Sequence, residues 1–171
     1  MILLRRKVSL ESLRAVIDRT HDGKPAWRGV LSAWREQIEG EFRSGRSAEG
    51  VRWVPRQPFA DEPGGPSTLQ KSGLLLRTWL GGPGSIAEVR PEGVRFGVSG
   101  ERLPYAAIHR EGGRILVTPR MRRFLAAQGR PLRANTRELV IPARPHAAAN
   151  PEIRGQAVRI YRRFLSTGDT P

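Results

Sequence analysis

The residues best suited to chemistry stand side by side at His109, Arg110 and Glu111. A histidine beside a carboxylate and a guanidinium could act as an acid or base on a phosphodiester. However, neighbours in sequence rarely converge on one substrate atom. The sequence also lacks a nucleophile elbow, an HExxH pattern and a pair of carboxylates at a useful spacing. It therefore predicts no catalytic residue, and we interpret the chain as a non-enzyme.

Metal and cofactor sites have no better support. Cysteine is absent, which excludes disulfides and thiolate ligands. The three histidines, His21, His109 and His146, lie far apart and lack metal-ligand spacing. The glycine-rich run at 81–84 has neither the lysine nor the strand-to-helix setting of a phosphate loop. We expect no metal and no cofactor.

Positive charge is the most marked feature of the composition. Lysine and arginine total 30 against 16 acidic residues, for a net charge of +14, and nearly all the basic residues are arginine. Such an excess of positive charge favours the hypothesis that the chain binds nucleic acid. However, arginine also pairs with carboxylates at protein interfaces. The arginines crowd residues 110–133, where Glu111 is the one acid, without a recognition-helix motif or a zinc finger. DNA binding through this surface is the alternative hypothesis.

The first elements that position these residues are two helices. Ser9 is a plausible N-cap for a helix through Thr20. A second helix, with Pro25 in its first turn, runs to Gly45 and carries an apolar stripe that includes Trp27 and Trp34, which we assign to the core. The stripe of the first helix is Leu10, Leu13, Val16 and Ile17.

Proline and glycine then dominate a loop at about 44–67, within which 51–54 could pair briefly as a strand. A third helix is expected from Thr68 to Leu80, unless it begins only after Gly73. A hairpin of 86–90 and 94–98 follows.

The stretch from Tyr105 to Arg144 is expected to form one helical turn at most, a strand at 115–117, a short helix from Pro119 and a strand at 139–141. The short helix should turn Met121, Phe124 and Leu125 inward and Arg120, Arg122 and Arg123 outward. A closing helix has Asn150 as cap, Pro151 in its first position and Gly168 after its end. The fold class predicted is α+β in a single domain, 1–171: N-terminal helices, a small mainly antiparallel sheet and a closing C-terminal helix.

Several short strings occur in an order that is characteristic as a set. They are Phe42, Gly50 and Trp53; Leu69 to Leu75; the Tyr-Ala-x-x-His run at Tyr105 to His109; Gly112-Gly113; and Ile-Pro-Ala-Arg-Pro at Ile141 to Pro145. In this order and spacing the chain resembles the phage virion morphogenesis proteins, which are tail completion proteins of contractile-tailed, Mu-like phages. It departs from them at Glu111 and His146, where an aromatic residue is common.

The resemblance implies a structural protein of the virion neck, built in the host cytoplasm. It would form a ring, most simply a hexamer, between the head connector or adaptor and the tail tube or sheath, with genomic DNA passing through the lumen. Ring subunits meet head to tail and so need two unlike faces, to which the loop at 44–67 could add an arm. No apolar run approaches the roughly 20 residues that cross a bilayer, so no membrane partner is expected.

The candidate interface residues are Arg144, Arg120, Arg122, Arg123, Tyr105 and His109. The prolines around Arg144 should hold the chain extended and direct its side chain outward or toward a buried acid. Pairing of Arg144 within the subunit is an equally good alternative. Tyr105 and His109 are as readily explained as packing or hydrogen-bonding residues beside the Gly-Gly turn.

Overall fold

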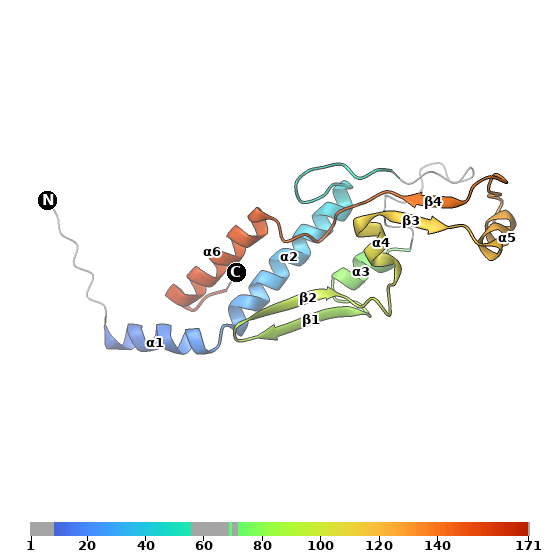
Figure 1. Ribbon diagram of the computed structural model, residues 1–171. Helices are drawn as coiled ribbons and strands as arrows, with labels where there is room; N and C mark the ends of the chain where they lie inside the picture. The colour runs from blue at the N-terminus through green and yellow to red at the C-terminus, as the bar shows by residue number, and fades with distance from the viewer. Residues whose placement is uncertain (1–8, 56–68, 70–71, 171) are drawn as a thin grey trace.

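The computed structural model describes residues 9–55, 69 and 72–170 (Figure 1). The elements in chain order are α1 (Leu10–His21), α2 (Lys24–Ser44), α3 (Leu74–Trp79), β1 (Ser85–Arg90), β2 (Gly93–Val98), α4 (Tyr105–Glu111), β3 (Gly113–Leu116), α5 (Pro119–Ala127), β4 (Glu138–Ile141) and α6 (Pro151–Thr167). This confirms the α+β class. The start expected for the third helix at Thr68 and the loop segment 56–67 lie outside the described residues, as do residues 1–8, in which the sequence could form a short strand.

Local capping chemistry sets the ends of the helices. The side chain of Ser9 accepts a hydrogen bond from the backbone N–H of Ser12, and that of Asn150 accepts one from Ile153. Each satisfies a donor that the first helical turn leaves unpaired. Gly45 ends α2 in the left-handed conformation, at a φ of +64°. The ends predicted for these helices are confirmed to within a residue.

Helix α2 organises the core, because its one apolar stripe serves two clusters. Toward its beginning, Ala26 and Val30 pack on Ile160 and Phe164 of α6. Toward its end, Ile38 and Phe42 pack with five further buried residues, namely Trp53, Leu75, Trp79, Leu103 and Ala106. The core assignment of the two tryptophans is confirmed: Trp27 packs against the first cluster and Trp34 against the second.

The strands form two separate antiparallel pairs in the described part of the chain. β1 and β2 make the predicted hairpin, with Pro91 and Glu92 between the paired residues Arg90 and Gly93, and this hairpin contacts α2. β3 pairs with β4. The single small sheet expected from the sequence is therefore two ribbons, because the connection through α4 carries β3 away from the first hairpin (Figure 1).

Two predicted helices have different bounds. α3 begins at Leu74, since Gly73 takes a left-handed φ of +66° that a continuous helix excludes; this was the second of the two alternatives. α4 has seven residues and is longer than the single turn predicted. It continues to Glu111 because the break in backbone geometry comes only at Gly112, with a φ of +75° and a ψ of 177°.

The orientation predicted for α5 is wrong for two residues. Phe124, expected inward, is 63% exposed, and Arg122, expected outward, is partly buried and donates hydrogen bonds to the carbonyl oxygens of Arg133 and Thr136. The helix stands at the tip of the β3–β4 ribbon, away from both core clusters (Figure 1). Its packing surface is therefore the loop that follows it.

The described chain is elongated, with α1 at one end and α5 at the other (Figure 1). We call residues 113–141, which comprise β3, α5 and β4, the arm. No helix in the described ranges is long and apolar enough to cross a membrane.

Candidate functional site

The two motifs that bound the stretch 105–144 meet in space. The backbone N–H of Arg144 donates to the carbonyl of His109 at 2.9 Å, and Gly113 pairs with Ile141 at the start of the β3–β4 ribbon. Gly112 lies so close to this strand that a Cβ added to it would stand 2.8 Å from the backbone nitrogen of Ala143. The Gly-Gly and Ile-Pro-Ala-Arg-Pro motifs are thus two sides of one backbone crossing.

The phenylalanine and tryptophan of the earlier motif reach the same place. Trp53 is 3% exposed, and its ring packs edge-on against Phe42 with centroids 5.4 Å apart. Its indole N–H donates to the carbonyl of Pro145 at 2.8 Å, across a separation of 92 residues. Motifs that are distant in sequence therefore form one structural hub, which we define as residues 41–42, 53–54, 105–113 and 141–147.

The buried carboxylate of Glu41 attaches the end of the hub segment 141–147 to helix α2. One of its oxygens accepts a hydrogen bond from the backbone N–H of Ala147 at 2.9 Å, and the other accepts one from Gln37 at 2.7 Å. Burial raises the pKa of Glu41, while these two hydrogen bonds act in the opposite direction. The contact fixes Ala147 in a left-handed conformation with a φ of +57°. The sequence analysis did not single out Glu41. Its position three residues after Ile38, on the apolar stripe of the helix, could have indicated a buried acid.

His146 fills an aromatic cage at the centre of the hub. It is 1% exposed, and its ring lies edge-on to Phe42, Trp79 and Trp53 at centroid distances of 5.5, 5.9 and 6.3 Å. Its Nδ1 lies 2.8 Å from the carbonyl oxygen of Arg144 and must carry the proton, because a carbonyl only accepts. The cage explains why an aromatic residue also suits this position.

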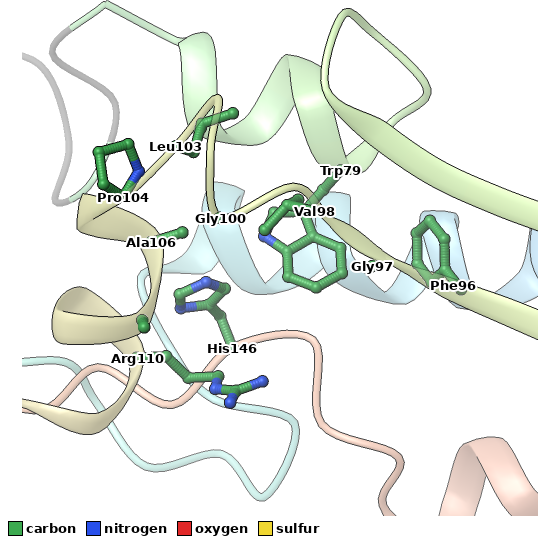
Figure 2. Close-up of a pocket in the computed structure, with 11 residues that line it drawn as sticks. Trp79, Phe96, Gly97, Val98, Gly100, Leu103, Pro104, Ala106, Arg110 and His146 are labelled. Carbon is green, nitrogen blue, oxygen red and sulfur yellow. The ribbon is translucent and has the colours of Figure 1, made fainter.

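An open hollow of about 430 Å³ lies beside the cage. Figure 2 shows His146 between Trp79 and α4, the helix that carries Ala106 and Arg110. The other lining residues are Phe96, Gly97, Val98, Gly100, Leu103, Pro104 and Ala107. The lining contains no carboxylate, and no group of three metal-ligating side chains occurs among the described residues. The hollow thus offers apolar surface, one arginine and one histidine.

Arg144 bonds within its own subunit, as one of the alternatives had it, although its partners are carbonyl oxygens and not an acid. The residue is 6% exposed, and its Nε donates to the carbonyl of Val54 at 3.0 Å. Burial lowers the pKa of Arg144, but an arginine stays protonated in proteins. The charge is therefore held inside the subunit by carbonyl oxygens, including that of Pro142.

The Tyr105 and His109 rings contact one another at the surface of α4. Their centroids are 5.9 Å apart, Tyr105 is 36% exposed, and the Nδ1 of His109 is buried with no hydrogen-bond partner among the described residues. The nearby Glu111 carboxylate pairs with Arg110 at 2.6 Å. The candidate acid/base group of the sequence is therefore not assembled as a histidine oriented by a carboxylate.

The remaining candidates lie at the other end of the arm. Arg120 and Arg123 are exposed on α5, whereas Arg122 ties α5 to the following loop. Arg114, on β3, pairs with Glu138 on β4 at 2.9 Å. The structure thus brings Arg144, Tyr105 and His109 together in the hub and places the α5 arginines apart from them.

The hub makes stability depend on pH. Burial lowers the pKa of His146 and of His109 below 6.5. The hydrogen bond to the Arg144 carbonyl acts in the opposite direction on the pKa of His146, and the positive charges of Arg110 and Arg144 add to the lowering at His146 and His109 respectively. The unfolded chain therefore binds protons first as the pH falls below about 6.5, and the folded chain loses stability there, at up to about 1.4 kcal/mol per pH unit for each histidine. The charged neighbours of His146 are Arg110, Arg144 and, through Ala147, Glu41; the raised pKa of Glu41 acts in the opposite sense at lower pH.

We expect His146→Phe to remove the share of this pH dependence that His146 contributes. Phenylalanine keeps the ring in the cage but does not titrate. Thermal melting measured between pH 7.5 and 5.5 should show a shallower decline for the variant than for the native chain, and His109→Asn/His146→Phe should flatten it further. An unchanged slope in both variants would contradict a neutral, buried His146.

The motifs that follow one another along the chain thus meet in one crossing of backbone and aromatic rings. The phage virion morphogenesis family matches residues 7–165, nearly the whole length, and the chain belongs to this family. Its role is therefore in the structure and assembly of a phage virion. Comparisons with curated proteins and with solved structures give no significant match.

Proposed function

We propose that the chain is a neck protein of a tailed phage that completes the upper end of the tail or joins it to the head, and that it does so as a ring, most simply a hexamer. The observation that supports this most directly is the elongated subunit, with α1 at one end and the arm, which is unlike it, at the other (Figure 1). Two unlike ends are what a head-to-tail contact requires, and such contacts form a ring where the rotation between copies closes.

The arm is the part of the subunit best placed to meet other virion proteins. Its tip carries the exposed Arg120 and Arg123, and exposed guanidinium groups form bidentate pairs with carboxylates. The partners proposed are neighbouring copies, the head connector or adaptor and the tail tube or sheath. Because α2 contributes to both core clusters, we also propose that the chain acts as one domain.

A charge reversal on α5 tests this function. Phage particles lacking the protein should show heads and tails that are unjoined, or tails of abnormal length, and the native chain should restore them. Arg120→Glu/Arg123→Glu should fold normally but restore at least tenfold fewer joined particles, because its exposed charges repel the acidic partner. Electron micrographs and plaque counts measure the effect.

Arg162→Glu/Arg163→Glu on α6 is the matched control, since both residues are exposed and lie outside the arm. It should restore particles as the native chain does. Equal rescue by the α5 variant would contradict a role for the arm in joining, and purified virions that contain none of the protein would overturn the neck assignment.

DNA binding is the second candidate, favoured by the exposed α5 arginines in a chain of net charge +14. It predicts a monomer that binds duplex DNA with steep salt dependence, because neutralising phosphates releases counterions. Light scattering at moderate salt separates the two: a ring supports assembly, and a monomer with salt-sensitive DNA affinity supports the alternative.

A further inference from the structure

The hollow beside the aromatic cage is lined by two residues that each have a buried nitrogen atom without a hydrogen-bond partner among the described residues. The atoms are Nε1 of Trp79 and Nε2 of His146, and the two residues are 6% and 1% exposed. Buried polar groups in folded proteins are nearly always paired, because an unpaired one loses its hydrogen bond to water without compensation. Two such atoms beside one hollow indicate that the hollow receives a group that pairs with them.

The two nitrogen atoms have complementary hydrogen-bonding roles. Nδ1 of His146 donates to the carbonyl of Arg144 at 2.8 Å, and burial lowers the pKa of the ring, so Nε2 is left as an acceptor. The indole N–H of Trp79 can only donate. The two ring centroids are 5.9 Å apart, and in Figure 2 the indole nitrogen lies on the edge of the Trp79 ring that is turned toward His146. One group that both donates and accepts can therefore pair with both atoms.

The remaining lining residues show what carries this group. Arg110 is paired with Glu111 at 2.6 Å. An apolar body that ends in a hydroxyl matches the other walls, and the side chain of tyrosine has this form. A hollow of about 430 Å³ has room for one aromatic ring. Those other walls are apolar side chains and glycines: Phe96, Gly97, Val98, Gly100, Leu103, Pro104, Ala106 and Ala107.

Neither tyrosine of the chain is free to enter the hollow of its own subunit. The chain has two. Tyr161 packs against Trp27 and Phe164, with ring centroids 5.2 and 6.4 Å away. Tyr105 lies on α4, which forms one side of the hollow, and its ring contacts His109. A tyrosine in the hollow therefore belongs to another protein, and tyrosine is enriched at protein interfaces.

We infer that the hollow receives a tyrosine side chain of another virion protein, whose hydroxyl donates to Nε2 of His146 and accepts from the indole N–H of Trp79. The ring of this tyrosine packs against the apolar walls. The inference rests on the proposed function, since it identifies one contact through which the chain meets a different protein of the virion. A buried aromatic anchor of this kind supplies much of the binding energy of an interface.

Two small molecules of similar shape test the site in solution. The first, p-cresol, is the tyrosine side chain as a free molecule, and the second, toluene, lacks its hydroxyl. Each is titrated into the native chain while the nuclear magnetic resonance signals of the Trp79 indole N–H and the His146 ring are recorded. We expect p-cresol to shift both signals and to bind about tenfold more tightly than toluene, because two hydrogen bonds form. A purely apolar hollow would prefer toluene, since a hydroxyl gives up its hydrogen bonds to water on entering it.

Two variants and a control locate the binding. His146→Phe retains a ring in the cage but removes the acceptor, so p-cresol should lose its advantage over toluene. Ala107→Trp, at an exposed residue of α4 that lines the hollow, should fill it and abolish the binding of both molecules. Val158→Trp adds the same side chain to α6 at a residue that is 50% exposed and outside the hollow, and it should bind p-cresol as the native chain does.

Phage particles that lack the protein test the partner. Ala107→Trp should restore about tenfold fewer joined particles than the native chain, because the tyrosine anchor is shut out. Val158→Trp should restore them fully. Tyr105→Phe, which removes the exposed tyrosine hydroxyl of this chain, should also restore them fully, because the occupant belongs to a different protein.

Three results would overturn the inference and leave the neck role standing. Toluene that binds as tightly as p-cresol, or a Trp79 signal that does not move, would show that the two nitrogen atoms do not meet an occupant. Full rescue by Ala107→Trp would show that no partner enters the hollow and that p-cresol binding is adventitious. A loss in Tyr105→Phe equal to that in Ala107→Trp would assign the tyrosine to a second copy. Virions that contain none of the protein would instead remove the neck role and the partner together.

Discussion

Gly112→Ala is expected to cost the folded chain about 3–5 kcal/mol, a large share of the stability of an ordinary domain. Two effects add. The backbone of Gly112, with a φ of +75° and a ψ of 177°, lies in a region that is essentially restricted to glycine. An added Cβ would also stand 2.8 Å from the nitrogen of Ala143 and 3.0 Å from the carbonyl oxygen of Ile141. Both obstructing atoms belong to backbone, so no side chain can move aside.

The neighbouring glycine provides the control. At Gly113 an added Cβ would meet only the flexible side chain of Ile108, at 3.3 Å. We expect Gly113→Ala to change the free energy of unfolding by about 1 kcal/mol or less. Denaturant titration of both variants measures the difference. Equal stabilities would show that the backbone crossing at Gly112 is not tightly packed and that the hub does not depend on this glycine.

The helix ends were predictable because they depend on neighbouring residues. Ser9, Asn150 and Pro25 act within three or four positions of themselves, through a side-chain cap or a preset φ. The stripe of α2 was equally readable, because one face of a long helix must be buried. In each case the residues that cause the feature lie close to one another in the sequence.

The orientation of an apolar side chain on α5 was predicted wrongly: Phe124 was expected inward and remains exposed. Leu13, on the apolar stripe of α1 for which no partner was predicted, is exposed as well. Periodicity indicates that a face is apolar but not whether it is covered by the same chain. The separation of β3–β4 from the first hairpin depends similarly on where α4 directs the chain, which no local pattern contains.

In the hub, too, some features could be predicted from the sequence and others could not. The motif strings could be recognised in the sequence, but several of their contacts join residues far apart in the chain, by 35 positions from His109 to Arg144 and by 106 from Glu41 to Ala147. Neither the buried guanidinium of Arg144 nor the cage around His146 could be derived from spacing. The order of the motifs was informative because each supplies one piece of a single three-dimensional crossing.

The hub maintains the fold of the subunit, whereas the exposed residues of α5 are among those that we propose meet other molecules. The hub residues satisfy one another within the subunit, as Glu41 and Ala147 do, so their substitution should act on folding. The exposed Arg120 and Arg123 of α5 are the residues that we propose act on association, and their substitution should leave the folded subunit intact. The two groups can therefore be distinguished by comparing unfolding with assembly for the same variants.

Trp53→Ala is the strongest expected case of the first group. The indole is 3% exposed, packs on Phe42, and donates to the carbonyl of Pro145 at 2.8 Å. Removing a buried tryptophan costs about 3–5 kcal/mol, and the Pro145 carbonyl loses its donor as well, at roughly 1–3 kcal/mol if it stays buried. The segment 144–147 would then keep only the Arg144–Val54 hydrogen bond of its two attachments to the loop after α2, so we expect a loss of stability of about 4 kcal/mol or more.

Val51→Ala is the matched comparison, two residues away and 65% exposed, and should change stability by less than about 0.5 kcal/mol. Trp53→Phe separates the two contributions: it retains an aromatic ring against Phe42 but removes the donor. It should therefore fall between the native chain and Trp53→Ala in urea titrations. If Trp53→Ala melts with the native chain, the Trp53 indole does not hold the Ile-Pro-Ala-Arg-Pro segment, and the hub is maintained by its other contacts, among them those of Glu41, Arg144 and the glycine crossing.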